Sequence, residues 1–374
     1  MSSRQSVEPW LRQHSVWRSV EHLAAGRSLP APVTVELQLG TECNLACPEC
    51  ISRPLPGPGR FVPARATEIA RELVALGVRC VVLSGGGEPL LHPEAGAVLQ
   101  TLAAGGVATA LVTNGTLLHT QLDAIAECAA RVRVSVDAAT SRTHGRFRPS
   151  RAGDECFPTV VANLGALARR MRGQLTFSFL VISRRDATSG VVESNAGEIV
   201  AAARLAREAG CHAFDVNLAF DRRPWIDPAH SVVARTLADQ VESLRELDGP
   251  EFRVCVGDLV EAVAAGRADP IPPAPGYARC PAAEIRAAVA PGGVFLCPRH
   301  MSLVAACYGD PVTTPLAEIW ASGARGGALG AVDPRRHCAG ACMSMGLNEE
   351  LLRAIDEARR GRQVALLPDT DLFM

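Results

Sequence analysis

Three cysteines close together near the start of the chain have the spacing of metal ligands. Cys43, Cys47 and Cys50 lie within eight residues, in a loop-like segment that directly follows a strand-like stretch. Iron–sulfur clusters use thiolate ligands, and three of them on a four-iron cubane leave one iron open for chemistry. Zinc and three unligated core cysteines are the alternatives. Zinc would need a fourth ligand, and the next ones, Cys80 and His92, are not local.

The overall composition limits the class of protein. The chain has 374 residues and 13 cysteines, and its 38 basic and 39 acidic residues give a formal net charge of −1. This balance argues against a nucleic-acid-binding protein built on a basic patch. The N-terminal segment shows no secretory signal, and no apolar run reaches the ~18 residues of a membrane span. We therefore expect a cytoplasmic protein with no nucleic-acid or membrane partner, whose cysteines are ligands or catalytic groups rather than disulfides.

The elements that must position these cysteines alternate between strand and helix. The predicted strands are Thr34–Leu39, Cys80–Leu83, Ala108–Val112, Val132–Val136, Leu175–Ile182 and Ala213–Leu218. The predicted helices are Ala64–Leu76, Glu94–Ala104, Leu117–Ala129, Phe157–Arg170, Ala196–Ala209 and Ser231–Leu247. This alternation predicts a parallel sheet with right-handed crossovers. Because six units are too few for an eight-unit barrel, we expect an α/β fold with a partial (β/α)6 TIM-like barrel; a doubly wound sheet is the alternative. Either fold places the working face at the carboxyl ends of the strands.

Polar motifs follow the next three predicted strands in chain order. They are Gly85–Pro89, with three glycines and an acid, then Thr113–Thr116, and then Ser135–Asp137. The glycines expose backbone groups with no side chain in the way, and the Lys-Ser/Thr of a phosphate-binding loop is absent. Together with the C-x3-C-x2-C spacing, these motifs resemble those of the radical S-adenosylmethionine (SAM) superfamily over residues 33 to about 220.

The resemblance implies a cofactor set and roles for several residues. Cys43, Cys47 and Cys50 would hold a [4Fe–4S] cluster whose free iron binds SAM. Gly86, Gly87 and Glu88 match the motif that holds the methionine amino group. The other implied cofactor-binding residues are Asn114, Ser135, Asp137 and Arg148, and the last of these belongs to a series with Ser141, His144 and Asn163. In this family, one electron cleaves SAM to methionine and a 5′-deoxyadenosyl radical, which takes a hydrogen atom from the substrate.

A second set of cysteines lies toward the end of the chain. Cys280 and Cys297 flank a predicted β-hairpin with a Pro-Gly-Gly turn, and Cys338 and Cys342 follow. The set resembles the SPASM/twitch extension of radical SAM enzymes, and the cysteine count is similar to the twitch form with one auxiliary [4Fe–4S] cluster. Zinc is the alternative metal, because four cysteines also suit a closed tetrahedral site. Cys307 competes as a ligand, or as a substrate-facing thiol that donates a hydrogen atom.

Proline-rich sequence near residue 270 marks a predicted domain boundary. We expect an N-terminal helical extension over 1–32 and the radical SAM partial barrel over 33–248. A twitch-type auxiliary cluster domain, made of a β-hairpin plus a helix, would span 249–345, and a C-terminal helix and tail 346–374. The final helix is predicted over Asn348–Arg362.

The resemblance extends to a reaction. Twitch enzymes with one auxiliary cluster include dehydrogenases that oxidise a secondary alcohol of an aminocyclitol or aminoglycoside during antibiotic biosynthesis, with the second electron passed to the auxiliary cluster. We expect such an oxidoreductase, acting on a small-molecule substrate and reduced by a flavodoxin or ferredoxin. The alternatives are an epimerase of a sugar or peptide with a cysteine hydrogen donor, a peptide-modifying maturase, and a non-catalytic electron carrier. The catalytic base cannot be named from the sequence.

Overall fold

The computed structural model describes residues 7–52, 59–185, 188–219, 232–267, 274–338, 342, 344–370 and 373. Its main feature is a ten-stranded sheet with the order β12-β11-β10-β1-β2-β3-β4-β5-β8-β9. The strands are β1 (Thr34–Gln38), β2 (Cys80–Ser84), β3 (Ala108–Thr113), β4 (Arg131–Ser135), β5 (Gln174–Val181), β8 (Ala213–Leu218), β9 (Arg253–Val256), β10 (Arg286–Ala290), β11 (Gly293–Phe295) and β12 (Cys307–Gly309). A separate hairpin joins β6 (Ser183–Arg185) and β7 (Val192–Ser194).

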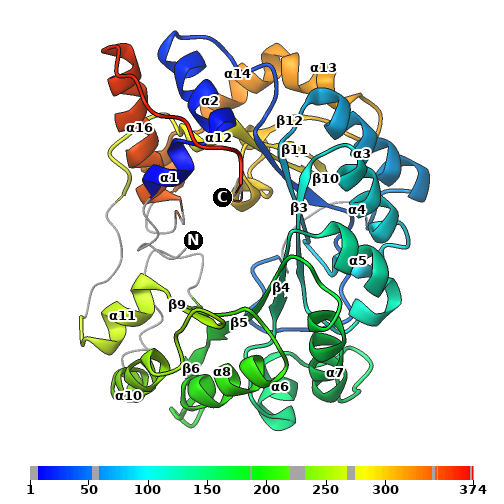
Figure 1. Ribbon diagram of the computed structural model, residues 1–374, viewed down its shortest axis with the longest axis vertical. Helices are drawn as coiled ribbons and strands as arrows, with labels where there is room; N and C mark the ends of the chain where they lie inside the picture. Colours follow the sequence, from blue (N-terminus) through cyan, green and yellow to red (C-terminus); the bar gives the residue numbers. More distant parts are fainter. Residues whose placement is uncertain are drawn as a thin grey trace.

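The sheet curves into an open arc, and most helices cover its outer side (Figure 1). The helices are α1 (Val7–Leu11), α2 (His14–Ala24), α3 (Pro63–Leu76), α4 (Ala95–Ala104), α5 (Leu122–Cys128), α6 (Ser141–Phe147), α7 (Phe157–Ala168), α8 (Ile199–Glu208), α10 (Ala234–Arg245), α11 (Asp258–Ala264), α12 (Ala282–Ile285), α13 (Leu316–Ala321), α14 (Gly323–Ala331), α15 (Pro334–His337) and α16 (Met345–Arg359). The predicted α/β fold with a parallel sheet is confirmed. All neighbouring strands from β10 through β1 to β9 pair in parallel.

The two faces of the sheet differ in polarity. On β1, Val35 and Leu37 are buried in a core shared with the helices. Because side chains alternate along a strand, Glu36 faces the opposite side. There it accepts a hydrogen bond from Ser84 at 2.8 Å. We call this inner side of the arc the bore; its polar residues include Glu36, Ser84, Arg133, Ser178 and Asp215. A polar lining suits a binding site, because a purely structural interior would be filled with apolar side chains.

The six predicted strands are present, and the chain adds one parallel strand that the pattern did not predict. The predicted barrel ends at residue 248, but β9 and α11 form one more strand–helix unit beyond it. The strand was missed because its four residues begin with an exposed arginine, Arg253, and none of them is fully buried. The predicted hairpin is also present as β10 and β11, and it continues the main sheet because β10 pairs with β1.

Several predicted helices begin or end elsewhere. Two of them start with a 3-10 turn, η2 (Leu118–Gln121) before α5 and η3 (Ala196–Glu198) before α8. The N-terminal amphipathic stretch is two helices, α1 and α2, and the final helix spans Met345–Arg359 rather than Asn348–Arg362. Ser231, the predicted start of the helix observed as α10, lies outside the described residues. The division of the chain into four regions stays a prediction.

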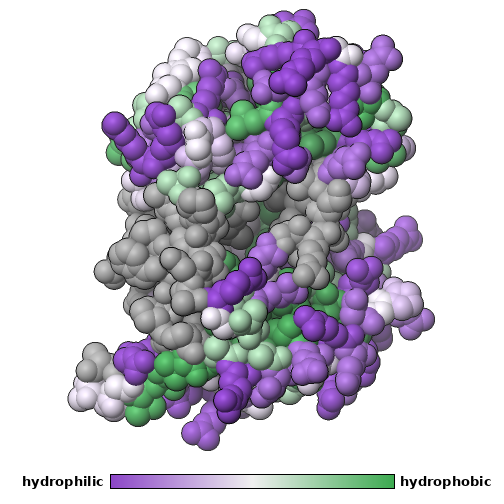
Figure 2. Space-filling model, turned by 90° about the vertical axis from the view of Figure 1, so that its left-hand side faces the viewer, coloured by the Kyte–Doolittle hydropathy of each residue, from purple (hydrophilic) through white to green (hydrophobic). Residues whose placement is uncertain are grey.

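In the view of Figure 2, the described residues form no large apolar face. Hydrophilic side chains cover most of the described part of this face, and the hydrophobic ones are scattered among them. The described residues also contain no helix with the length and apolar character that crossing a membrane requires. Near the end of the chain, the tail returns to the N-terminal helices, where the backbone N–H of His14 donates to the carbonyl of Leu367 at 2.9 Å.

Candidate active site

The loop that carries Cys43, Cys47 and Cys50 is held at the carboxyl end of β1 by backbone contacts. The carbonyl of Glu42 accepts a hydrogen bond from the N–H of Glu88 at 2.8 Å, and the N–H of Ala46 donates to Pro149 at 2.7 Å. These bonds attach the loop both to the segment after β2 and to the segment after α6. The three thiols therefore sit at the predicted working face.

The electrostatics of these thiols suit a bound cation. Burial raises the pKa of Cys43 and Cys47, and the neighbouring thiols of the loop raise both pKa values further. Arg148 acts in the opposite direction on the pKa of Cys47, and its Nη1 lies 4.0 Å from the Cys47 Sγ. Thiols with raised pKa values stay protonated alone but lose the proton to a coordinating metal. Three such thiols fit an iron–sulfur cluster, and their assignment as ligands stays a prediction.

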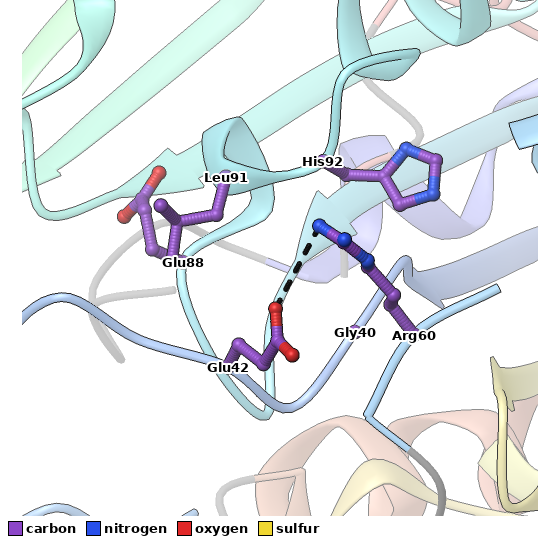
Figure 3. Close-up of a pocket in the computed structure, with 6 residues that line it drawn as sticks. All are labelled: Gly40, Glu42, Arg60, Glu88, Leu91 and His92. Carbon is purple, nitrogen blue, oxygen red and sulfur yellow. Dashed lines mark ion pairs between the residues drawn. The ribbon is translucent and has the colours of Figure 1, made fainter. Parts of the chain in front are cut away.

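The glycine-rich segment after β2 lies against the cysteine loop. A Cβ placed on Gly87 would come within 1.8 Å of the Glu42 carbonyl oxygen, and one on Gly85 within 2.0 Å of the Gly87 oxygen. No residue with a side chain fits these positions without moving the backbone. Figure 3 shows the small pocket at this junction, where Glu42 forms an ion pair with Arg60 at 3.8 Å and Gly40, Glu88, Leu91 and His92 complete the lining.

Replacing Gly87 with alanine should reduce SAM cleavage by roughly 100-fold, because the new Cβ pushes the cysteine loop away from Glu88 and a misplacement of about 1 Å has that cost. The measurement is the rate of 5′-deoxyadenosine formation with dithionite as reductant. The matched control is Gly145→Ala, because Gly145 has no neighbouring atom within 4 Å of an added Cβ. A Gly87→Ala variant as active as the Gly145→Ala variant would contradict the proposed role of this contact.

Glu88 is a buried carboxylate in a fixed orientation. Its Oε1 accepts from Thr113 Oγ1 at 2.7 Å, and its Oε2 accepts from the N–H of Asn114 at 2.8 Å. Burial raises the pKa of Glu88, while these hydrogen bonds lower it. The group is therefore oriented at the carboxyl ends of β2 and β3, as a residue that holds a cofactor amine would have to be.

Asn114 links the same strand end to the cysteine loop. Its Nδ2 donates to Asn44 Oδ1 at 2.9 Å and lies 3.9 Å from the Cys43 Sγ, while its Oδ1 accepts from Thr116. Sequence reasoning did not single out Asn44. The sequence signal for Asn44 was weak, because an asparagine beside a cysteine occurs in many structural contexts.

Asp137 holds Arg148 beside the cysteine loop. Its Oδ2 accepts from Arg148 Nε and its Oδ1 from the N–H of Leu180, both at 2.6 Å. Both carboxylate oxygens are thus engaged within the protein. Burial opposes the charge on Arg148, but Asp137 and Cys47 raise its pKa above the usual value. Asp137 has a φ of +59°, a left-handed conformation that aspartate tolerates better than most residues. Ser135 stands at the end of β4 facing the bore.

Replacing Asp137 with asparagine should destabilise the apoprotein by about 3–5 kcal/mol, because it leaves the buried Arg148 charge uncompensated. Asparagine also adopts positive φ, so the change tests the charge rather than the backbone. Urea unfolding measures the effect. In the control, Asp123→Asn, the exposed pair with Arg170 is lost, and the expected change is below about 1 kcal/mol. Equal effects of the two changes would contradict the structural importance of the Asp137–Arg148 pair.

The rest of the polar series supports the backbone around the site. Asn163 donates to the carbonyls of Gly115 and Thr116 at 2.8 and 3.1 Å. His144 is 1% exposed and packs on Phe157, and burial lowers its pKa to about 4. Ser141 is the first residue of α6. These side chains fix the loops that carry the site.

The four C-terminal cysteines form a second group at the opposite end of the barrel strands. Cys338 interacts electrostatically with the other three thiols, and Cys280 interacts with those of Cys297 and Cys342. Burial is the main reason that the pKa of Cys280 is raised and that of Cys338 reaches about 12. Cys297 follows β11, and its Sγ lies close to the Arg286 side chain at the start of β10. Arg286 in turn pairs with Thr34, the first residue of β1. We call Cys280, Cys297, Cys338 and Cys342 the cysteine quartet.

Polar side chains that the sequence did not single out surround the cysteine quartet. Arg286 Nη2 lies 3.1 Å from the Cys297 Sγ, and His300 Nε2 lies 3.2 Å from the Cys338 Sγ. Asn348 is fully buried; its Oδ1 lies 3.6 Å from the Cys280 Sγ and its Nδ2 lies 4.0 Å from the Cys342 Sγ. The only feature of the sequence that pointed to Arg286 was a single charged residue at the start of an otherwise apolar strand. Four thiols with such neighbours fit an iron–sulfur cluster by their donor chemistry, because partners of this kind orient and tune ligands.

Cys307 contacts a different set of residues. It packs with Ala288, Ala290, Phe295 and Met301 in a small apolar cluster. The described contacts link it to this cluster rather than to the quartet, so a substrate-facing role stays a prediction. Within the described residues, no group of three or more His, Cys, Asp or Glu side chains is placed to hold a single metal ion. Metal analysis distinguishes iron from zinc at the quartet.

Charged residues around the mouth of the bore are mostly paired. Arg184 on β6 bonds Glu49 of the cysteine loop at 3.1 Å and Glu193 on β7 at 2.8 Å. Asp215 in the bore lies 3.7 Å from Arg133. Asp310 caps its own turn by accepting from the N–H of Val312 at 2.8 Å.

A parallel α/β arc with a cysteine loop at the carboxyl end of its first strand defines a partial-barrel enzyme that works through a bound cofactor. Residues 37–187 match the family model of the Radical SAM superfamily. The resemblance based on the sequence motifs is therefore confirmed. The superfamily binds a [4Fe–4S] cluster and SAM.

Curated relatives share the barrel part of the chain. The AdoMet-dependent heme synthase of Methanosarcina barkeri is 28% identical over 190 residues, which are 50% of each chain. A GTP 3′,8-cyclase of Synechococcus is 30% identical, over 47% of this chain and 52% of its own. The mycofactocin maturase MftC of Mycobacterium tuberculosis is 29% identical, over 43% and 40%. The chain thus spans about half the length of the curated relatives it matches.

Solved structures share the fold over more of the chain. Streptococcus suis SuiB bound to the precursor peptide SuiA matches with a TM-score of 0.60 at 12% identity, over 85% of this chain and 71% of SuiB. The enzyme anSMEcpe with bound AdoMet matches with a TM-score of 0.57 at 13% identity, over 88% and 97%. These neighbours are SPASM/twitch-type radical SAM enzymes, which carry auxiliary clusters. This protein therefore has the fold of that group.

Proposed function

We propose that this radical SAM enzyme is an oxidoreductase that holds SAM and its cluster at Cys43, Cys47 and Cys50 and a second [4Fe–4S] cluster at the cysteine quartet. The placement of two thiol groups at opposite ends of one bore carries this proposal. The first follows the last residue of β1, and Arg286, beside the quartet, pairs with the first residue of β1. The five-residue strand that lies between them is roughly 15 Å long.

When bound, the cofactors would supply a radical that removes one hydrogen atom from the substrate and a cluster that accepts one electron. A secondary alcohol that loses this hydrogen atom, this electron and a proton becomes a ketone. The chain would contribute binding, orientation and exclusion of water. Glu88, held by Thr113 and Asn114, would bind the SAM amino group, and Asp137 would keep Arg148 beside the cysteine loop.

The bore favours a small polar substrate. Glu36 and Asp215 contribute two carboxylates to it, and Ser84 and Ser178 contribute hydroxyl groups. Acids and hydroxyls of this kind can bind an amine and several hydroxyl groups at once, as an aminocyclitol or aminoglycoside intermediate would need. The second candidate is a peptide substrate, which the fold likeness to SuiB and the sequence likeness to MftC favour.

Iron, sulfide and zinc analysis after anaerobic reconstitution tests the two-cluster proposal. We expect about eight irons and eight sulfides per chain, since each cubane holds four of each. About four irons with one zinc would contradict it and favour a redox-neutral reaction such as epimerisation. A panel of aminocyclitols and of short peptides, scored by 5′-deoxyadenosine formed and by loss of two hydrogens from the substrate, then decides between the two substrate classes.

A further inference from the structure

Arg286 is a half-buried cation beside the cysteine quartet. It begins β10, where the remaining residues are small or apolar, and its side chain points into the bore face next to Thr34 and Glu36. Its Nη2 lies 3.1 Å from the Cys297 Sγ and its Nη1 donates to Ser344 Oγ at 3.3 Å. Its Nε is buried and has no hydrogen-bond partner among the described residues. The guanidinium is therefore only partly satisfied by its present neighbours.

The charge environment of Arg286 is dominated by the quartet. Burial opposes its charge, but Cys297, Cys280 and Cys342 raise its pKa, with a smaller contribution from Glu36. A buried guanidinium without a full carboxylate partner is costly, unless negative charge comes from another source. A cluster with four thiolate ligands provides that charge, because a [4Fe–4S] cluster with four thiolates is an anion in either of its common oxidation states.

We propose that Arg286, through its positive charge and its hydrogen bond to the Cys297 sulfur, raises the reduction potential of the auxiliary cluster and so suits it to accept an electron. This inference rests on the proposed function, because it requires a cluster at the quartet. The reduced cluster carries one more negative charge than the oxidised cluster, and a fixed cation stabilises the more negative form. Hydrogen bonds to the ligand sulfurs act in the same direction, and both effects are strong where water is excluded. Arg286 is thus a positioning and tuning residue rather than a ligand.

The test is a redox titration of the reconstituted full-length protein, followed by electron paramagnetic resonance. Addition of SAM changes the signal of the cluster at Cys43, Cys47 and Cys50, so the signal that does not respond to SAM reports the auxiliary cluster. In Arg286→Gln, we expect the ratio of reduced to oxidised auxiliary cluster at a fixed potential to fall at least tenfold, which is about 59 mV for one electron. Arg286→Lys keeps the charge but loses the planar fork, and we expect a smaller fall in the same direction.

The matched control is Arg353→Gln, which removes the same charge from the exposed surface of α16, where Arg353 pairs with Glu350. Its auxiliary signal should titrate as in the wild type, because water and salt screen a surface charge. An unchanged potential in Arg286→Gln would overturn the inference. If that variant does not retain the cluster, an unchanged or raised potential in Arg286→Lys would do so. Wild-type protein with a single cluster would instead refute the proposed function, and the role of Arg286 with it.

Discussion

Replacement of any one of Cys43, Cys47 and Cys50 with alanine will lower 5′-deoxyadenosine formation by at least about 1,000-fold, and replacement of all three will cost little more. Residues that act as one unit in catalysis show this non-additivity. In the proposed site, each thiol would be one of three protein ligands on a cluster that must present an open iron to SAM, so the loss of one ligand should remove the site. The measurement is 5′-deoxyadenosine formed with dithionite as reductant.

The control for this series is Cys128→Ala at the end of α5, a partly buried cysteine away from the loop. It should retain wild-type activity, which excludes a general effect of thiol removal. Substantial 5′-deoxyadenosine formation by the triple variant would show that SAM cleavage does not depend on these cysteines. The assignment of the first cluster would then be wrong, whatever the superfamily to which the chain belongs.

Replacement of Cys280 and Cys297 together with alanine will remove about half of the iron and abolish substrate oxidation, while SAM cleavage stays within about tenfold of the wild type. The expectation follows from the position of the quartet, at the end of β1 opposite to the SAM-cleaving site. The electron acceptor would be lost, but the loop that cleaves SAM would keep its contacts with Glu88 and Pro149. Iron analysis, 5′-deoxyadenosine and oxidised product are measured in the same samples.

Cys307→Ala is the matched control for the second prediction, because Cys307 packs with Ala288 and Phe295 in the apolar cluster rather than with the quartet. Its iron content should equal that of the wild type. A loss of iron in this control would make Cys307 a ligand and would require a different set of four. Unchanged iron in the double variant would mean that the quartet holds zinc or no metal.

Local sequence was enough to predict the parts of the site that lie on one segment. The spacing of Cys43, Cys47 and Cys50 is visible in the sequence alone, because the three thiols lie within eight residues of the one segment that joins β1 to α3. The run of glycines after β2 was also recognised from the sequence. At Gly85 and Gly87 only a residue without a side chain allows the observed backbone contacts. Apolar residues recur with period 2 in the strand-like segments and with period 3.6 in the helix-like segments, and the alternation of the two kinds of segment predicted the parallel sheet.

Tertiary structure decided everything that depends on residues far apart in the chain. The two antiparallel partners β10 and β11 were predicted, but the pairing of β10 with β1 joins residues about 250 positions apart, and no local pattern encodes it. The same pairing brings Arg286 to the bore, and packing of α16 brings Asn348 between Cys280 and Cys342. Likewise, only the fold shows that Asp137, predicted to lie at the cofactor, forms an ion pair with Arg148. The sequence by itself predicted the class of enzyme and the candidate thiol ligands, because ligand spacing is local. The environment that tunes those thiols was decided by the fold, because burial and charge depend on which distant segments meet.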